Sequence, residues 1–190
     1  MPWISDLPDI RYSSNLKSPA IAVTECGRVA TVIPDTNDTY HLILMCDEPI
    51  THGIVDVTVN IGGRTTGCCY SLGCVPGPRH PVQWEYPFGY GSTSNRINGW
   101  GLHDNSGRAD DSAGIYSRGQ KLAPSTKGYT SGDRVRMRID IDRGDMQFWV
   151  NDVPCAELRG VEEIRANGIF LASTIFNKGA TWSIVEQSAE

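Results

Sequence analysis

The chain has 190 residues and a net charge of −5 at pH 7, with 39% hydrophobic and 21% charged residues. This length suits a single globular domain, and the acidic balance argues against a general nucleic-acid binder, which concentrates lysine and arginine on one face. The sequence contains no run of about 18 apolar residues, as a spanning helix needs, and residues 1–14 lack the basic start and apolar core of a signal peptide, so we expect an intracellular, cytoplasmic protein without a membrane anchor.

The composition favours one all-β domain. The 20 glycines and 11 prolines are typical of many short strands joined by tight turns rather than of long helices. Residues 1–16 show no clean period, so we expect them to form an extended arm over a domain that spans residues 17–190. Apolar runs and period-two alternation predict the first strands at 21–24, 29–33, 40–45 and 54–61.

The middle of the chain contains a segment of small residues and two long loops. The glycines and cysteines of residues 67–74 suit a central strand under closely packed neighbours. Residues 76–98 carry four prolines and four aromatic side chains, which argues against both a central strand and a solvated linker. A second, polar loop is predicted at 103–116, and long ordered loops in compact domains usually carry function. The best helix signal, at 155–165, predicts one short turn.

Residues 131–152 show the clearest pattern, because apolar and polar side chains alternate through two strands that flank a turn at 142–145. The Asn151-Asp152 pair ends the second strand, since both residue types tolerate left-handed backbone angles. The pattern predicts an antiparallel hairpin with one face in the core and one in solvent. The inward side chains are Val135, Met137, Ile139, Ile141, Met146, Phe148 and Val150, and the outward ones are Arg134, Arg136, Arg138, Asp140, Gln147, Trp149 and Asn151. We interpret the three arginines as a solvated strand face that pairs with Asp140 and neighbouring carboxylates.

The hairpin resembles SPRY domains, which carry a Gly-Asp opening, an apolar strand ending in Asp-x-Asp, a glycine turn and an aromatic-x-x-Asn strand. The resemblance covers about two-thirds of the chain. One departure is that Val55 and Asp56 stand where the family commonly has Trp and Glu. The matching segments are Gly99–Leu102, Gly132-Asp133, Asp140-x-Asp142, Gly144, Phe148–Asn151, Gly168–Ala172 and Trp182–Ile184.

The sequence offers no convincing catalytic or metal-binding constellation. The six cysteines lack paired Cys-x-x-Cys spacing and are expected to be buried free thiols. Calcium is an open alternative for the polar loop with Asp104, Asn105, Asp110 and Asp111, whose spacing does not fit an EF-hand. Neither an acid pair suited to a glycosidase nor a framed serine or cysteine nucleophile is found. We therefore expect no enzyme, no cofactor and no metal.

The resemblance implies an antiparallel, jelly-roll β-sandwich that binds a protein or peptide partner through loops at one end, without chemistry. We expect a monomer with Trp100 and Trp182 in the core. Aromatic and arginine side chains dominate binding hot spots, and the predicted partner-binding residues are Trp84, Tyr86, Tyr90, Arg96, Tyr116 and Trp149. The alternative is a carbohydrate-binding sandwich in which Trp84 or Trp149 stacks on sugar, with or without calcium. A hydrolase on the same scaffold ranks last.

Overall fold

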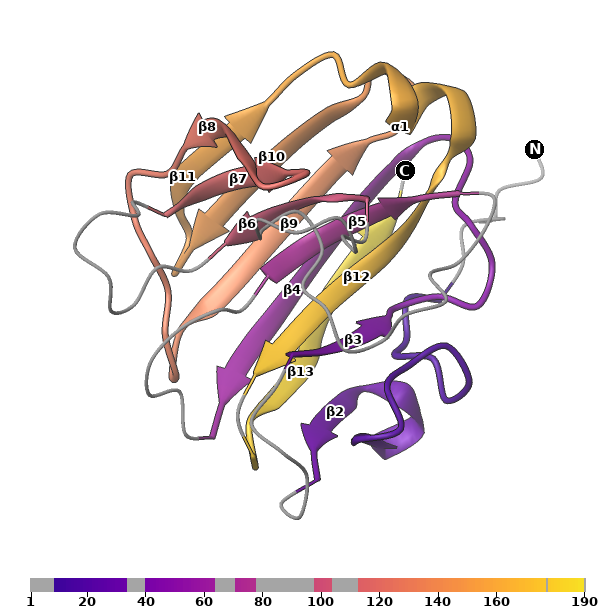
Figure 1. The fold of residues 1–190 in the computed structure, drawn as a ribbon, viewed down its shortest axis with the longest axis vertical. Helices are drawn as coiled ribbons and strands as arrows, with labels where there is room; N and C mark the ends of the chain where they lie inside the picture. The colour runs from indigo at the N-terminus through magenta and orange to yellow at the C-terminus, as the bar shows by residue number, and fades with distance from the viewer. Residues whose placement is uncertain are drawn as a thin grey trace.

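The computed structural model describes residues 9–33, 40–63, 71–77, 98–103, 113–176 and 178–189, which form two antiparallel sheets, one short α-helix and a 3-10 turn, η1 (Glu25–Gly27) (Figure 1). One sheet has seven strands in the order β1-β2-β13-β4-β9-β10-β11, and the other has six in the order β3-β12-β5-β6-β7-β8. In the first sheet the strands are β1 (Ile21–Thr24), β2 (Val29–Val32), β13 (Thr181–Ala189), β4 (Ile54–Gly62), β9 (Arg134–Asp140), β10 (Asp145–Val150) and β11 (Val153–Leu158). In the second they are β3 (Tyr40–Leu44), β12 (Ile169–Phe176), β5 (Ser71–Pro76), β6 (Trp100–His103), β7 (Gly114–Ser117) and β8 (Gln120–Pro124).

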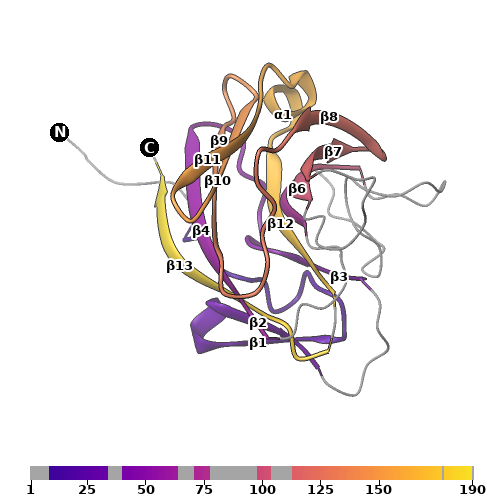
Figure 2. The same ribbon diagram turned by 90° about the vertical axis from the view of Figure 1, so that its left-hand side faces the viewer.

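The two sheets lie face to face as the layers of a sandwich (Figure 2). Each long strand alternates between side chains that enter the space between the layers and side chains that leave it, as period two requires. The inward side chains of both sheets form one continuous apolar core. This architecture confirms the predicted antiparallel, jelly-roll β-sandwich.

Aromatic side chains join the two layers of the core. Trp182 of β13 is fully buried, and Trp100 of β6 is almost so, as predicted. Tyr129 lies edge-to-face against Trp182, with the ring centroids 6.4 Å apart, and donates a hydrogen bond from its hydroxyl to the carbonyl of Leu102 at 2.9 Å. A buried tyrosine hydroxyl needs such a partner, so Tyr129 ties one sheet to the other at a defined depth.

The β9–β10 hairpin follows the predicted alternation. Met137 pairs with Phe148 and Val135 with Val150 across the two strands, and all four side chains are buried. Asn151 and Asp152 have φ angles of 51° and 64°, the left-handed turn that the sequence predicts. The alternating side chains thus place one face of the hairpin in the core and the other in solvent.

The segment after this hairpin corrects one expectation. Residues 155–165 were predicted as a helical turn, but Cys155 lies in β11, which pairs with β10, and the helix α1 spans only Glu162–Asn167. Strand β11 is the edge of its sheet, and an edge strand tolerates Pro154 because one side of its backbone needs no ladder partner. Pairing with β10 therefore takes the first part of this segment into the sheet, and the short helix forms only at its end.

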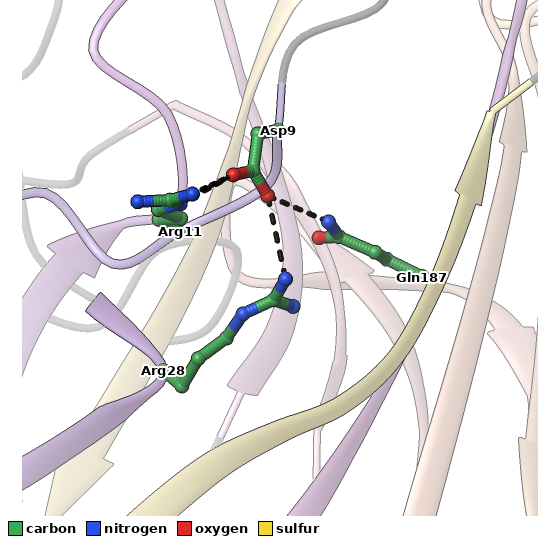
Figure 3. Close-up of polar contacts among 4 residues, drawn as sticks. All are labelled: Asp9, Arg11, Arg28 and Gln187. Carbon is green, nitrogen blue, oxygen red and sulfur yellow. Dashed lines mark hydrogen bonds and ion pairs between the residues drawn. The ribbon is translucent and has the colours of Figure 1, made fainter. Parts of the chain in front are cut away.

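Residues 9–18 run along β3 and the residue that follows it. The amide of Arg11 donates to the carbonyl of Met45 at 3.0 Å, and the amide of Ser13 to that of Leu44 at 2.9 Å. Asp9 accepts hydrogen bonds from Arg11 and from Gln187 of β13, the latter at 2.7 Å, and lies 3.4 Å from Arg28 (Figure 3). The hydrogen bonds from Arg11 and then Gln187 lower the pKa of Asp9.

Candidate binding surface beside Trp149

Two of the six predicted binding residues lie in the part of the chain that the structure describes. Trp84, Tyr86, Tyr90 and Arg96 fall outside it. Their segment leaves the six-stranded sheet after Pro76, at the end of β5, and the chain rejoins that sheet at Trp100, at the start of β6. Tyr116 and Trp149 are described, and they belong to different sheets.

Tyr116 differs from its expected place in a loop. It lies in β7, which pairs with β6 on one side and β8 on the other, and only 5% of its surface is exposed. Its ring packs edge-on against His103, with the ring centroids 5.6 Å apart, and the ammonium of Lys121 lies 5.5 Å from its centre. Flanking strands therefore enclose a residue that the polar composition of 103–116 placed in a loop.

Trp149 points outward from β10, as predicted, and is half-buried. Arg136 is its direct partner on the neighbouring strand β9, and the guanidinium carbon of Arg136 lies 4.7 Å from the centre of the Trp149 ring. Within about 6 Å of an aromatic face, a cation is attracted by the electron density of the ring. One face of the indole is thus already occupied by a side chain of the same sheet.

A buried carboxylate holds Arg136 in place. Asp56 of β4 is 7% exposed, and its two oxygens accept bonds from Nε of Arg136 at 2.8 Å and from Nη2 at 2.5 Å. These hydrogen bonds raise the pKa of Arg136. Arg138 approaches the same carboxylate, with its Nη1 3.5 Å from Oδ2.

The arginine face is paired with neighbouring carboxylates, as expected. Arg134 lies 3.0 Å from Glu186 and 3.8 Å from Asp152, while Asp56 contacts the other two arginines. Asp140 also accepts a hydrogen bond from the backbone amide of Arg143 at 3.0 Å and so takes part in the turn. Its place at the end of β9 makes it a turn residue, whereas Asp56 lies beside the arginines on the adjacent strand.

An apolar groove of about 530 Å³ opens beside Trp149, between the edge strands of the two sheets. Trp149 and Pro154 line it from the seven-stranded sheet, and Ala123 and Pro124 line it from β8. The amide of Thr126, just after β8, donates to the carbonyl of Cys155 in β11 at 2.9 Å and joins the two sheets at this edge. The groove therefore has walls from three strands whose spacing the fold determines.

The cysteines depart from the expected burial at one position. Cys46, Cys74 and Cys155 are buried free thiols, but Cys26 is exposed, because it lies in a tight turn with a φ of 55°. Burial raises the pKa of Cys46 to about 12 and also raises that of Cys74. Cys68 and Cys69 lie outside the described residues.

Among the described residues, no three or more His, Cys, Asp or Glu side chains gather as a metal site would require. The candidate calcium residues Asp104, Asn105, Asp110 and Asp111 fall outside those residues. The described chain also contains no helix with the length and apolar character needed to cross a bilayer.

Solved structures share this architecture, although no family sequence model and no curated protein sequence matches the chain. The SPRY domain of human HERC1 superposes with a TM-score of 0.65 at 16% identity, over 92% of this chain and 97% of that one. The TRIM65 PSpry domain gives 0.62 at 14% identity, over 95% and 93%, and a human SPRY domain gives 0.56 at 17%, over 87% and 94%. The chain therefore has the fold of a SPRY domain, as the motifs around its β9–β10 hairpin predicted.

Proposed function

We propose that this chain is a non-catalytic, intracellular interaction module that binds a peptide or protein partner. The observation that carries the proposal is the half-buried Trp149, stacked on Arg136 and forming one wall of the apolar groove at the sandwich edge. Binding hot spots are enriched in tryptophan and arginine, which desolvate a large area and keep a polar handle. The predicted contribution of the loops remains part of the proposal, through Trp84, Tyr86, Tyr90 and Arg96.

The groove suits a segment of polypeptide. Its lining residues include Trp149, two prolines and two alanines, with Gln147 and Glu157 as polar members, and apolar clefts with a few polar groups bind extended chains through their side chains. Leu122 of β8 and Val153 of β11 are large apolar side chains that remain 45% and 51% exposed on the two edge strands. A partner covering the groove would remove this apolar surface from water, which favours association.

Two acids at the β9–β10 turn, Asp142 and Asp145, already accept hydrogen bonds from backbone amides. The Oδ2 of Asp142 accepts the amide of Gly53 at 3.1 Å, and Oδ1 of Asp145 accepts that of Gly160 at 2.9 Å. An acid that already serves as a backbone acceptor is poorly suited to donating a proton to a leaving group. This use of the acids supports binding rather than hydrolysis.

Selection of peptides tests the proposal directly. The purified chain is immobilised and panned against a displayed library of random peptides, and the affinity of the enriched peptides is then measured for variants. Trp149→Ala should weaken binding at least tenfold, as truncation of a hot spot does. Phe176→Ala provides a matched control, because Phe176 is also a half-buried aromatic residue in the other sheet, where its ring lies tilted at 47° against Tyr40 with the ring centroids 5.0 Å apart.

The same measurement includes the loop residues and the alternative ligand class. Trp84→Ala and Tyr86→Ala test the predicted contribution of residues 76–98. Peptides that bind wild type and all three variants equally would place the site elsewhere.

A glycan array with and without chelator examines the carbohydrate alternative, and glycan binding without any selected peptide would replace the proposed function.

A further inference from the structure

The orientation of Trp149 depends on a contact chain that crosses three strands. Arg136 of β9 pairs with Trp149 of β10 on one side and with Thr58 of β4 on the other, and its guanidinium reaches along β4 to Asp56. The indole ring contacts the guanidinium of Arg136, and the Asp56 carboxylate contacts that same guanidinium as well as the guanidinium of Arg138. Arg136 is therefore the residue that links Asp56 to the ring.

The geometry of the Asp56 contact restricts the guanidinium strongly. Nε and Nη2 bind the two carboxylate oxygens at 2.8 and 2.5 Å, so the plane of the fork is fixed by two bonds rather than one. Asp56 is nearly inaccessible to water, although the side chains of its partners Arg136 and Arg138 are 39% and 32% exposed, and a hydrogen bond to a buried carboxylate is stronger than one in water. A guanidinium fixed in this way presents one flat face to the indole and restricts the rotamers that Trp149 can adopt.

A second arginine on the same strand serves as an internal comparison. Arg134 precedes Arg136 by two residues and points to the same solvent face. Its partners are Glu186 and Asp152, whose side chains are 66% and 75% exposed. Exposed ion pairs of this kind contribute little, because solvent screens the charges and the side chains lose entropy on pairing. Of these two sites, the one at Arg136 combines a buried acid with an aromatic partner.

We propose that Asp56 is a positioning residue for partner binding, which holds Arg136 against Trp149, a lining residue of the groove, and so fixes the orientation of the indole before a partner arrives. The inference rests on the proposed function, since it assigns a role to a residue that does not itself line the groove. A ring held in its bound orientation loses less conformational entropy on association, which is how preorganisation increases affinity.

Fluorine NMR measures the ring position without any partner. The five tryptophans are replaced by 5-fluorotryptophan, and Trp149→Phe identifies the Trp149 resonance. Asp56→Asn should shift or broaden that resonance and leave the other tryptophans unchanged. Glu186→Gln is the matched control, because it removes the same charge from the same face, where the ion pair of Glu186 is with Arg134.

Binding of the selected peptides provides the functional measurement. Asp56→Asn should weaken their binding about two- to fivefold, the loss expected when an exposed cation–π contact is no longer held, and Glu186→Gln should leave it unchanged. Arg136→Lys keeps the positive charge but lacks the planar fork, so it should reproduce the effect of Asp56→Asn and provides a second variant if Asp56→Asn folds poorly.

These measurements distinguish failure of the positioning role of Asp56 from failure of the proposed binding function. A Trp149 resonance identical in folded wild type, Asp56→Asn and Arg136→Lys would overturn the positioning role. A resonance that moves without any loss of peptide affinity would overturn its link to binding and leave the proposed function intact. If wild type selects no peptide at all, the proposed function fails and the binding role of Asp56 fails with it.

Discussion

The turn at Gly144, within the β9–β10 hairpin, is hydrogen-bonded to Val161, the residue before α1. A methyl group added at Gly144 should lower the stability of the protein. Gly144 has a φ of 70°, and the amide of Val161 donates to its carbonyl at 2.9 Å. A Cβ at this position would lie 2.4 Å from the carbonyl oxygen of Val161 and 2.8 Å from its nitrogen. Backbone atoms cannot rotate away as a side chain can, so Gly144→Ala must displace the two segments.

Two contributions set the magnitude. Placing an L-residue with a Cβ in the left-handed region costs about 1–2 kcal/mol. Forcing an extra carbon into a closely packed contact costs about 1–3 kcal/mol more. Gly144→Ala should therefore lower the free energy of unfolding by about 2–5 kcal/mol.

Gly160→Ala separates these contributions. Gly160 has a φ of 68°, close to that of Gly144, but a Cβ added to it would meet no atom of the described residues within 4 Å. Its replacement should cost only the backbone contribution of about 1–2 kcal/mol. Urea unfolding followed by tryptophan fluorescence and by circular dichroism measures both variants. Equal losses for the two variants would refute the argument that the Val161 contact adds to the cost of the φ angle at Gly144.

Three other features of the described chain can be measured directly. Cys26 is exposed whereas the other described cysteines are buried, so brief alkylation near pH 8 with peptide mapping should label it ahead of them; equal labelling would contradict this burial. The hydrogen bond from Arg11 lowers the pKa of Asp9 (Figure 3). The stability that the Asp9 carboxylate contributes to the folded state is therefore fully present above the ordinary pKa of 3.8, and it is lost as the pH falls through the lowered pKa. Asp9→Asn should therefore be less stable than wild type near pH 7 and equal to it well below that pKa, and a difference that persists in acid would exclude this carboxylate as the cause. Phe148→Ala should lower the free energy of unfolding by about 3–5 kcal/mol and Trp149→Ala by about 1–2 kcal/mol, because the two neighbours point to opposite faces of β10; the reverse order in thermal or urea unfolding would show that the faces are assigned wrongly.

The hairpin shows what can be predicted from local pattern. Alternation of apolar and polar residues is a property of each strand alone, so the inward and outward faces of β9 and β10 follow from their residues before any partner strand is known. The turn residues are equally local, since the φ angles of Asn151 and Asp152 depend on their own side chains. For this reason the hairpin, its outward Trp149 and the jelly-roll class were predicted correctly.

Pairing between distant strands is beyond such a pattern. The three arginines were expected to pair with Asp140 and neighbouring carboxylates, but the pattern did not identify Asp56, the partner of Arg136 that is 80 residues away in the chain. Tyr116 was assigned to a loop from the polarity of its neighbours, but β6 and β8 enclose it in a sheet. Both differences have the same origin, because which strands become neighbours depends on how the whole chain packs.

By itself, then, the amino-acid order determined the strand faces, the turns and the class of fold, since each of these follows from side-chain periodicity and backbone preference over a few residues. Only the tertiary structure decided that Asp56 lies beside Arg136, that Trp149 stands at the margin of a groove, and that β8 and β11 close the same edge of the sandwich. These contacts depend on the order of strands within the sheets, which results from the joint burial of apolar surface by segments far apart in the chain.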